Sequence, residues 1–285
     1  MAPAARLMDF RIPHFPFRTY LKSAMSGLDP AQQASRDQFD RQSAAYGKGH
    51  ILSRTADLES ALPHLGLKPG MEALDIATGG GHTAVFFASR GLHVTAADIA
   101  PGMLAQARTL AGGAGVTLET REHPAESLPY ADGVFDLVTC RVAAHHFSCP
   151  ATFCMETSRV LKRGGKFLLI DGSVEDDQPV AEEWIHRVEK LRDPSHGRFI
   201  TPLKWTHLCG HVGMRVIHSE LQPMKQPDLE WYFSAANTPP ENRKQVLDLI
   251  RTAPAAAKEL FHVNTDDHGK ITWWWQRLVM VSEKL

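Results

Sequence analysis

Short apolar runs alternate with amphipathic segments through the middle of the chain, from about residue 50 to residue 173. Five runs have the length and composition of buried strands: 72–77 (EALDIA), 92–98 (LHVTAAD), 116–122 (VTLETRE), 135–141 (FDLVTCR) and 166–171 (KFLLID). Segments 83–90, 101–110 and 151–161 are predicted to be helices, because glycines or a proline mark their ends. Strands and helices in alternation predict an α/β fold with a doubly wound, mostly parallel sheet.

The pattern is coarser towards the C-terminus. It predicts helices at 178–191 and 201–213, strands at 214–222 and 270–282, and a polar, partly helical region at 227–260. Trp273, Trp274 and Trp275 should alternate between the two faces of the last strand, which favours a structural role. Residues 1–46 contain proline, glutamine and serine with weak helical periodicity, and are interpreted as an N-terminal arm.

The strongest chemical signal is the glycine turn after the first strand. Gly79, Gly80 and Gly81 would let the backbone approach a ligand closely, and they free N–H groups at the start of the next helix. Asp75 lies on the strand just before this turn. Asp98 ends the second strand, where an acidic side chain can bind ribose hydroxyl groups.

Two cofactor classes could use such a turn. Residues 79–84 satisfy the Gly-x-Gly-x-x-Ala form of the dinucleotide fingerprint, and a dinucleotide needs a cradle for its diphosphate. S-adenosylmethionine (SAM) carries no phosphate but has an ammonium group, which Asp75 suits better than it suits a diphosphate. The sequence therefore favours SAM over a nicotinamide dinucleotide.

Five ordered motifs between residues 71 and 173 carry a family resemblance. They are 75–81 (DIATGGG), 98–104 (DIAPGML), 125–130 (AESLPY) with Asp132 and 135–136 (FD), 140–147 (CRVAAHHF) and 159–165 (RVLKRGG). As a set they resemble class I SAM-dependent methyltransferases, in particular the ubiquinone/menaquinone-biosynthesis C-methyltransferase-like group. The resemblance implies a Rossmann-like, seven-stranded, mostly parallel sheet with an antiparallel C-terminal strand and helical lid elements.

The resemblance also implies positions for the cofactor. Asp75, Ala77, Thr78, Gly79 and Gly81 would hold the methionine end, and Arg141 would lie near it. Asp98 would hold the ribose, Ile99 and Met103 would flank the adenine, and Ala125 and Glu126 would meet its edge. Tyr46 belongs to a weaker match in the arm. Ala77 stands where the strictest motif has glycine, and no loss is expected from it.

His145 and His146 follow the fourth strand, at the sheet edge where the transferred methyl group should lie. A histidine there could accept a proton from the acceptor, because its unperturbed pKa is near 6.5. His146 is slightly preferred over His145 as a base, while packing beside the methionine end is the alternative for both. These histidines with Cys149 and Cys154 match no zinc pattern, so no metal is expected.

Composition narrows the range of partners. The net charge is −1, without the basic excess of a dedicated nucleic-acid binder, and an Asn/Asp-Pro-Pro-aromatic motif is missing after the fourth strand. No apolar run reaches the length of a membrane helix, and the four cysteines form no disulfide framework. We therefore expect a cytoplasmic enzyme with no nucleic-acid partner and no integral membrane association.

The sequence thus predicts an arm or lid at 1–46 and a methyltransferase domain at 47–285, with substrate-covering insertions at about 174–212 and 223–269. The expected reaction is SAM-dependent methyl transfer to a carbon, oxygen or nitrogen atom of a small molecule. A SAM-binding protein without transfer activity, or with another SAM reaction, is the first alternative. An NAD(P)-dependent oxidoreductase is the second.

Overall fold

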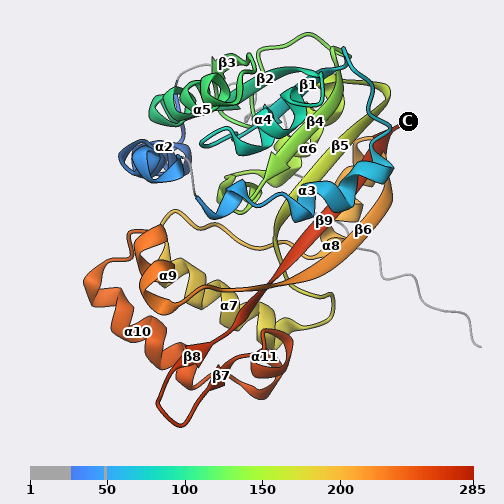
Figure 1. Ribbon diagram of the computed structural model, residues 1–285. Helices are drawn as coiled ribbons and strands as arrows, with labels where there is room; N and C mark the ends of the chain where they lie inside the picture. The colour runs from blue at the N-terminus through green and yellow to red at the C-terminus, as the bar shows by residue number, and fades with distance from the viewer. Residues whose placement is uncertain (1–26, 48–49) are drawn as a thin grey trace, which may run out of the picture.

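A seven-stranded sheet forms the centre of the molecule in the computed structural model, which describes residues 27–47 and 50–285 (Figure 1). Its strands are β1 (Glu72–Ile76), β2 (His93–Asp98), β3 (Glu119–Glu122), β4 (Phe135–Arg141), β5 (Leu161–Ser173), β6 (Met214–Lys225) and β9 (Trp274–Lys284). They lie in the order β3-β2-β1-β4-β5-β9-β6. The first five run parallel, and β9 pairs antiparallel with both β5 and β6. This confirms the doubly wound sheet with an antiparallel C-terminal strand.

Helices cover both faces of this sheet. Those of the described chain are α2 (Pro30–Gln42), α3 (Ala56–Ala61), α4 (His82–Ala88), α5 (Pro101–Ala114), α6 (Pro150–Val160), α7 (Pro179–Arg192), α8 (Pro202–His211), α9 (Leu229–Ala235), α10 (Pro240–Arg251) and α11 (Ala255–Leu260). Short 3₁₀-helices are η1 (Ser43–Tyr46), η2 (Ile51–Ser53), η3 (Leu62–His64) and η4 (Ala144–His146). None of the helices in the described ranges is both long and apolar enough to cross a membrane.

Alternating side chains along each strand divide the core into two layers. Leu137 of β4 packs on the side of α3 and α4, and its neighbour Val138 packs on the side of α6 and α8. Since a strand buried on both faces needs apolar residues at consecutive positions, this explains the continuous apolar runs in the sequence.

A third apolar cluster builds a smaller lobe from α7, α9, α10 and α11. Figure 1 shows this lobe below the sheet, with β6 and β9 extending into it. Trp184, Tyr232 and Trp273 are buried at its centre. Helix α7 lies in the segment 174–212 and α9, α10 and α11 lie in the segment 223–269, whereas α8 packs against the sheet; the substrate-covering role of these segments stays a prediction.

Three strand boundaries differ from the prediction. The third strand begins at Glu119 rather than at residue 116, and β5 begins at Leu161, because it bulges around Gly164 before the regular pairing with β4. The predicted strand 270–282 is divided: β8 (Ile271–Thr272) pairs with β7 (Asn264–Thr265), and β9 starts at Trp274. Trp273 therefore packs into the smaller lobe between two strands.

The described part of the N-terminal arm is more regular than its sequence suggested. Residues 30–42 form α2, which begins with a capping box in which Asp29 and Gln32 bond each other's backbone. This helix packs against α5 above the carboxyl ends of β1 and β2 (Figure 1). Residues 1–26 of the predicted arm lie outside the described residues.

Candidate active site

A cavity of about 900 Å³ lies where the strand order reverses between β1 and β4. Such a reversal opens a crevice at the carboxyl ends of parallel strands, where ligands of doubly wound folds bind. Twelve residues that the sequence singled out line it: Tyr46, Asp75, Ala77, Thr78, Gly79, Asp98, Ile99, Met103, Ala125, Glu126, Arg141 and His146. We call this space the first cavity.

The glycine turn forms one wall of the first cavity. Gly79 and Gly81 have φ angles of 53° and 86°, which glycine adopts without steric cost. A Cβ atom on Gly80 would lie 2.1 Å from the carbonyl oxygen of Tyr46, so this glycine lets η1 pack directly on the turn. Gly81 does not line the cavity; a Cβ atom there would meet Ala107 of α5 at 2.7 Å.

Two buried carboxylates flank the turn. Asp75 accepts hydrogen bonds of 2.6 Å from the hydroxyl groups of Thr78 and Thr139. Asp98 accepts bonds from the backbone N–H groups of Gly79 (2.8 Å) and Ala100 (2.9 Å). Burial raises the pKa of each carboxyl group to about 6, and these hydrogen bonds oppose the shift. Both acids are therefore ionised at neutral pH without a bonded cation, which suits a ligand with an ammonium group and hydroxyl groups.

The far end of the first cavity is mainly apolar. Ile99, Met103 and Ala125 line it, and Glu126 lies at its edge. The Glu126 carboxylate is already bonded, because it accepts from the backbone N–H of Ser148 and from the side-chain amide of Gln32 in α2. Glu126 therefore holds α2 at the edge of the cavity and also places carboxylate oxygen atoms there.

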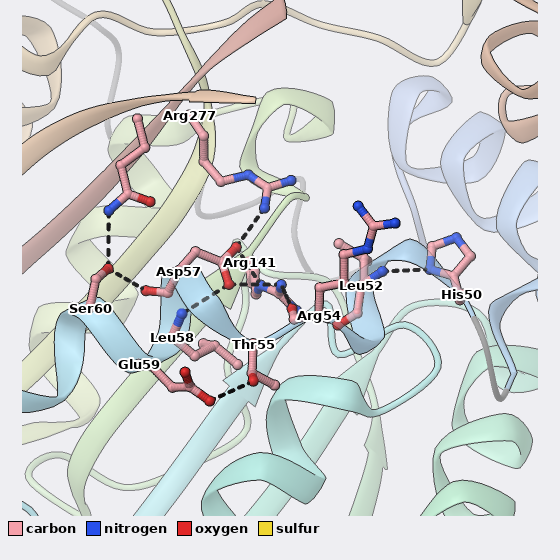
Figure 2. A network of polar contacts seen from close by, with 11 residues as sticks. His50, Leu52, Arg54, Thr55, Asp57, Leu58, Glu59, Ser60, Arg141 and Arg277 are labelled. Carbon is pink, nitrogen blue, oxygen red and sulfur yellow. Dashed lines mark hydrogen bonds and ion pairs between the residues drawn. The ribbon is translucent and has the colours of Figure 1, made fainter. Parts of the chain in front are cut away.

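Arg141 holds the chain segment beside the cavity. Its guanidinium donates to the Asp57 carboxylate and to the carbonyl oxygens of Leu52 and Arg54, four hydrogen bonds of 2.7 to 3.0 Å. Figure 2 shows the group turned towards Asp57. The geometry therefore gives Arg141 a positioning role for residues 50–57; because Arg141 also lines the first cavity, the cofactor contact that the family motif implied stays a prediction.

A second cavity of about 640 Å³ adjoins the first, between the sheet and the smaller lobe. Phe39, Tyr46, Leu52, Val142 and His146 line both cavities, while His145, Arg192, Asp193, Met224, Trp231, Trp275 and Arg277 line only the second. Trp275 is therefore a cavity wall as well as a packing residue. We call this space the second cavity.

His145 forms a buried pair with Asp171 at the base of the second cavity. Its Nδ1 lies 2.6 Å from one Asp171 oxygen, and its backbone N–H donates to the other at 2.8 Å. Burial lowers the pKa of the imidazole, but the carboxylates of Asp171, Asp193 and Glu189 together raise it by more, so the net pKa lies above its ordinary value. Among the described residues Nε2 has no hydrogen-bond partner, which leaves it available to a molecule in the cavity.

His146 is placed differently from its neighbour. Its Nδ1 lies 3.0 Å from the hydroxyl group of Ser195, which in turn donates to Asp193. Burial, with the adjacent positive charge of His145, lowers the pKa of His146 to about 4. The contacts and the pKa directions favour His145 as the stronger base, whereas the sequence slightly preferred His146; which histidine acts on a substrate stays a prediction.

Several cavity residues escaped the sequence analysis. They are Gln32, Ser35, Leu52 and His123 in the first cavity, and Met224 and Arg277 in the second. They come from α2, η2, the segment after β3, and the strands β6 and β9. No local sequence signal marks them, because only tertiary packing brings them to the sheet edge.

Known proteins share both sequence and architecture with this chain. A family model described as a methyltransferase domain matches residues 74–169. An uncharacterized methyltransferase of Bacillus subtilis (strain 168), YcgJ, is 29% identical over 234 residues, which are 81% of this chain and 91% of that protein. Its crystal structure has a TM-score of 0.74, with 28% identity over 81% of this chain and 99% of the other.

Two further relatives extend this picture. A protein of Bacillus halodurans C-125, solved as a methyltransferase candidate, has a TM-score of 0.75 and 31% identity over 80% of this chain and 99% of its own. The ubiquinone biosynthesis O-methyltransferase of Cereibacter sphaeroides is 27% identical over 229 residues, which are 78% of this chain and 84% of the relative.

Proposed function

This chain belongs to the class I SAM-dependent methyltransferase family, and we propose that it methylates a hydroxyl group of a small molecule bound in the second cavity. It is an enzyme, and its cofactor is SAM. The observation that carries the choice of acceptor is the His145–Asp171 pair, which faces the second cavity and can take a proton from a hydroxyl group. The name of one relative, an O-methyltransferase, agrees with this choice.

The first cavity fits SAM in donor chemistry, because acidic side chains lie beside the glycine turn and apolar side chains line the far end. Asp75 would meet the ammonium group, Asp98 the ribose hydroxyl groups, and Ile99 with Met103 the adenine ring. When bound, SAM supplies an electrophilic methyl group on a positively charged sulfur.

The same geometry argues against a dinucleotide. A diphosphate beside the glycine turn would lie close to the ionised carboxylates of Asp75 and Asp98. Arg141, the cation nearest these acids on β4, is bonded to Asp57 and to two carbonyl groups. The site therefore fits the cofactor of an NAD(P)-dependent oxidoreductase less well than it fits SAM.

His145 would act on the acceptor's proton. The acceptor oxygen would receive the methyl group that bound SAM supplies, and S-adenosylhomocysteine would be left. The acceptor proton passes to Nε2 of His145, and Asp171 stabilises the resulting imidazolium. Positioning and exclusion of water would supply most of the acceleration, with α2 and the smaller lobe as the covering elements.

The net charge and the state of the cysteines bear on the partner and on the location of the protein. The acceptor is a small molecule and not a nucleic acid, because the chain has a net charge of −1 and aromatic residues form part of the lining of its second cavity. All four cysteines are unpaired thiols, which agrees with a reducing compartment such as the cytoplasm.

The proposal is tested by assaying S-adenosylhomocysteine (SAH) release with SAM and a panel of phenols and enols. We expect product that is heavier by one methylene group, and a fall in kcat of about 100-fold in His145→Gln with SAH affinity kept within about twofold. His146→Gln, the matched neighbour, should lose much less. Equal losses in both variants would show that His145 is not the base. SAH binding without methylation of any acceptor would favour a SAM-binding protein that transfers no methyl group.

The dependence of kcat/KM on pH tests the same base in a second way. His145 must be neutral to accept a proton, so kcat/KM should rise as pH increases through its raised pKa. Glu189 of α7 and Asp193, which follows this helix, raise this pKa as Asp171 does. Asp171→Asn should therefore shift the rise to lower pH and reduce the plateau. An unchanged profile would contradict the role of the pair.

A further inference from the structure

Arg277 reaches the second cavity from β9. Its backbone pairs with Gly172 of β5, one residue beyond the Asp171 that holds His145. The side chain is 13% exposed and lines the second cavity but not the first. Arg277 is therefore placed to contact a methyl acceptor without contacting SAM.

Asp57 is shared between two guanidinium groups. Arg141 takes both carboxylate oxygens in a bidentate pair, with distances of 3.0 and 2.9 Å. Arg277 reaches the same carboxylate through one bond, from Nη1 to Oδ2 at 2.6 Å. Two positive charges thus face one negative charge, and Figure 2 shows both arginines converging on Asp57.

The unused donors belong to Arg277. Arg141 is also bonded to the carbonyl oxygens of Leu52 and Arg54. Within the described part of the chain, Nε and Nη2 of Arg277 have no hydrogen-bond partner. Burial lowers the pKa of Arg277, Asp57 opposes this shift, and the positive charge of Arg141 adds to it. The excess charge of this triad therefore lies beside open space, where a monoanion would stabilise it.

The other ionisable groups of the second cavity are balanced by a carboxylate of their own, bonded, or neutral. Arg192 donates to Glu189 and to the carbonyl oxygen of Tyr232, and His145 keeps Nε2 unbonded but is paired with Asp171. Asp193 accepts from Ser195 and from Gln38 of α2. Burial, followed by the nearby positive charges, lowers the pKa of His50 to about 4, so it is neutral at physiological pH. Among the described residues, Arg277 is thus the cation of this cavity that shares its carboxylate with a second arginine and keeps two donor nitrogens unbonded.

The walls beside Arg277 are apolar and rigid. Trp231 and Met224 line the second cavity, and Trp275 is fixed because its indole N–H donates to the buried Glu189. Such walls fit a flat or apolar body, and the guanidinium of arginine matches the geometry of a carboxylate.

We propose that Arg277 binds a carboxylate of the methyl acceptor, so that the enzyme selects aromatic or other apolar acids over their neutral analogues. The proposal rests on the proposed function, because it assumes that the second cavity holds the acceptor. Arg277 is then a specificity-determining residue, distinct from the base His145 and from the residues around SAM.

The test measures binding of matched acids and primary amides to the SAH-loaded enzyme by quenching of tryptophan fluorescence. The pairs are 4-hydroxybenzoate, 4-hydroxycinnamate and indole-3-acetate, each against its amide. We expect at least one acid to bind about 10- to 100-fold more tightly than its amide, as a charge-assisted hydrogen bond allows. In Arg277→Gln the ratio should fall below about twofold, and Arg277→Lys should recover part of it.

The controls separate this proposal from the proposed function and from misfolding. Arg215→Gln removes a 63%-exposed arginine from the neighbouring strand β6, and it should keep the full acid preference. SAH affinity should stay within about twofold in all variants, because Arg277 lies outside the first cavity. If the wild-type enzyme prefers no acid over its amide, or if Arg277→Gln keeps the preference, the proposal is wrong. Failure to bind SAH would instead contradict the proposed function.

Discussion

Two hydroxyl groups, and no cation, hold the carboxylate of Asp75 in the folded chain. The side chain is buried, and the hydrogen bonds from Thr78 and Thr139 only partly replace its lost hydration. The resulting pKa of about 6 corresponds to a cost of about 3 kcal/mol for ionising the group in the folded state. A bound ammonium group would offset this cost, which couples ligand binding to stability at this residue.

Asp75→Asn separates stability from binding. Because the folded pKa lies above the unfolded value, the wild-type protein loses stability as pH rises from about 4 to about 6. Asparagine carries no charge and can still bond both threonines. The ligand-free variant should therefore be more stable at pH 8 by about 1–3 kcal/mol, with no gain at pH 4, while SAH affinity at pH 8 falls more than about tenfold.

Chemical denaturation at both pH values, together with SAH titration, checks this expectation. A variant that is less stable than the wild type at pH 8 would show that the carboxylate is needed for folding. Unchanged SAH affinity would show that Asp75 does not meet the ligand.

Individual site residues could be predicted from the sequence where their chemistry depends on their local position in the chain. Asp75 and Asp98 could be placed because each lies at a strand end beside a glycine turn. Gly80 could not be distinguished from its neighbours, because its importance lies in the close approach of Tyr46. Ala77 adopts a φ of 52°, which explains why glycine suits this position in the family motif.

The helix α2 is joined to the first turn of α5. The residue before α5, Ala100, has no side chain that could cap the helix. Asp40 of α2 caps α5 instead, because its carboxylate accepts from the backbone N–H of Gly102 at 2.7 Å. Gln32 joins the same helix to Glu126, so α2 is fastened on two sides of the first cavity. We propose on this basis that α2 acts as a lid.

Asp40→Ala should loosen this lid. Loss of a capping carboxylate costs about 1 kcal/mol, so we expect SAH to dissociate about three- to tenfold faster. Hydrogen exchange in α2 and in the first turn of α5 should increase as well. Asp37→Ala is the matched control, because the bond that Asp37 makes among the described residues is to Gln33 of its own helix. Equal behaviour of the two variants would rule out the docking bond as a determinant of closure.

The boundaries of helices and strands could be predicted from the sequence where local signals, such as a proline, mark them. Pro101, Pro150 and Pro202 each begin a helix close to the predicted start. The split before β9 was missed, because residues 270–282 read as one continuous apolar run and only pairing with β7 separates Ile271 from Trp274. The regular helix α2 was missed as well, since most of its residues are polar and docking stabilises it.

In the whole molecule, two cavities meet at one edge of the sheet. The first is built by strand ends that follow the family pattern, and the second is closed by the smaller lobe. Val142 lies between them and has a φ of 55°, a strained value for a β-branched residue. This arrangement separates the cofactor, which motifs reveal, from the acceptor, whose site depends on contacts between distant segments.

The central claim is that the first cavity is a SAM site, and calorimetric titration of the purified protein with SAH and NADH in parallel tests it most directly. The account predicts one SAH per chain, bound with a micromolar dissociation constant, and no detectable binding of NADH. Binding of NADH without SAH would contradict it and would make the glycine turn a dinucleotide site.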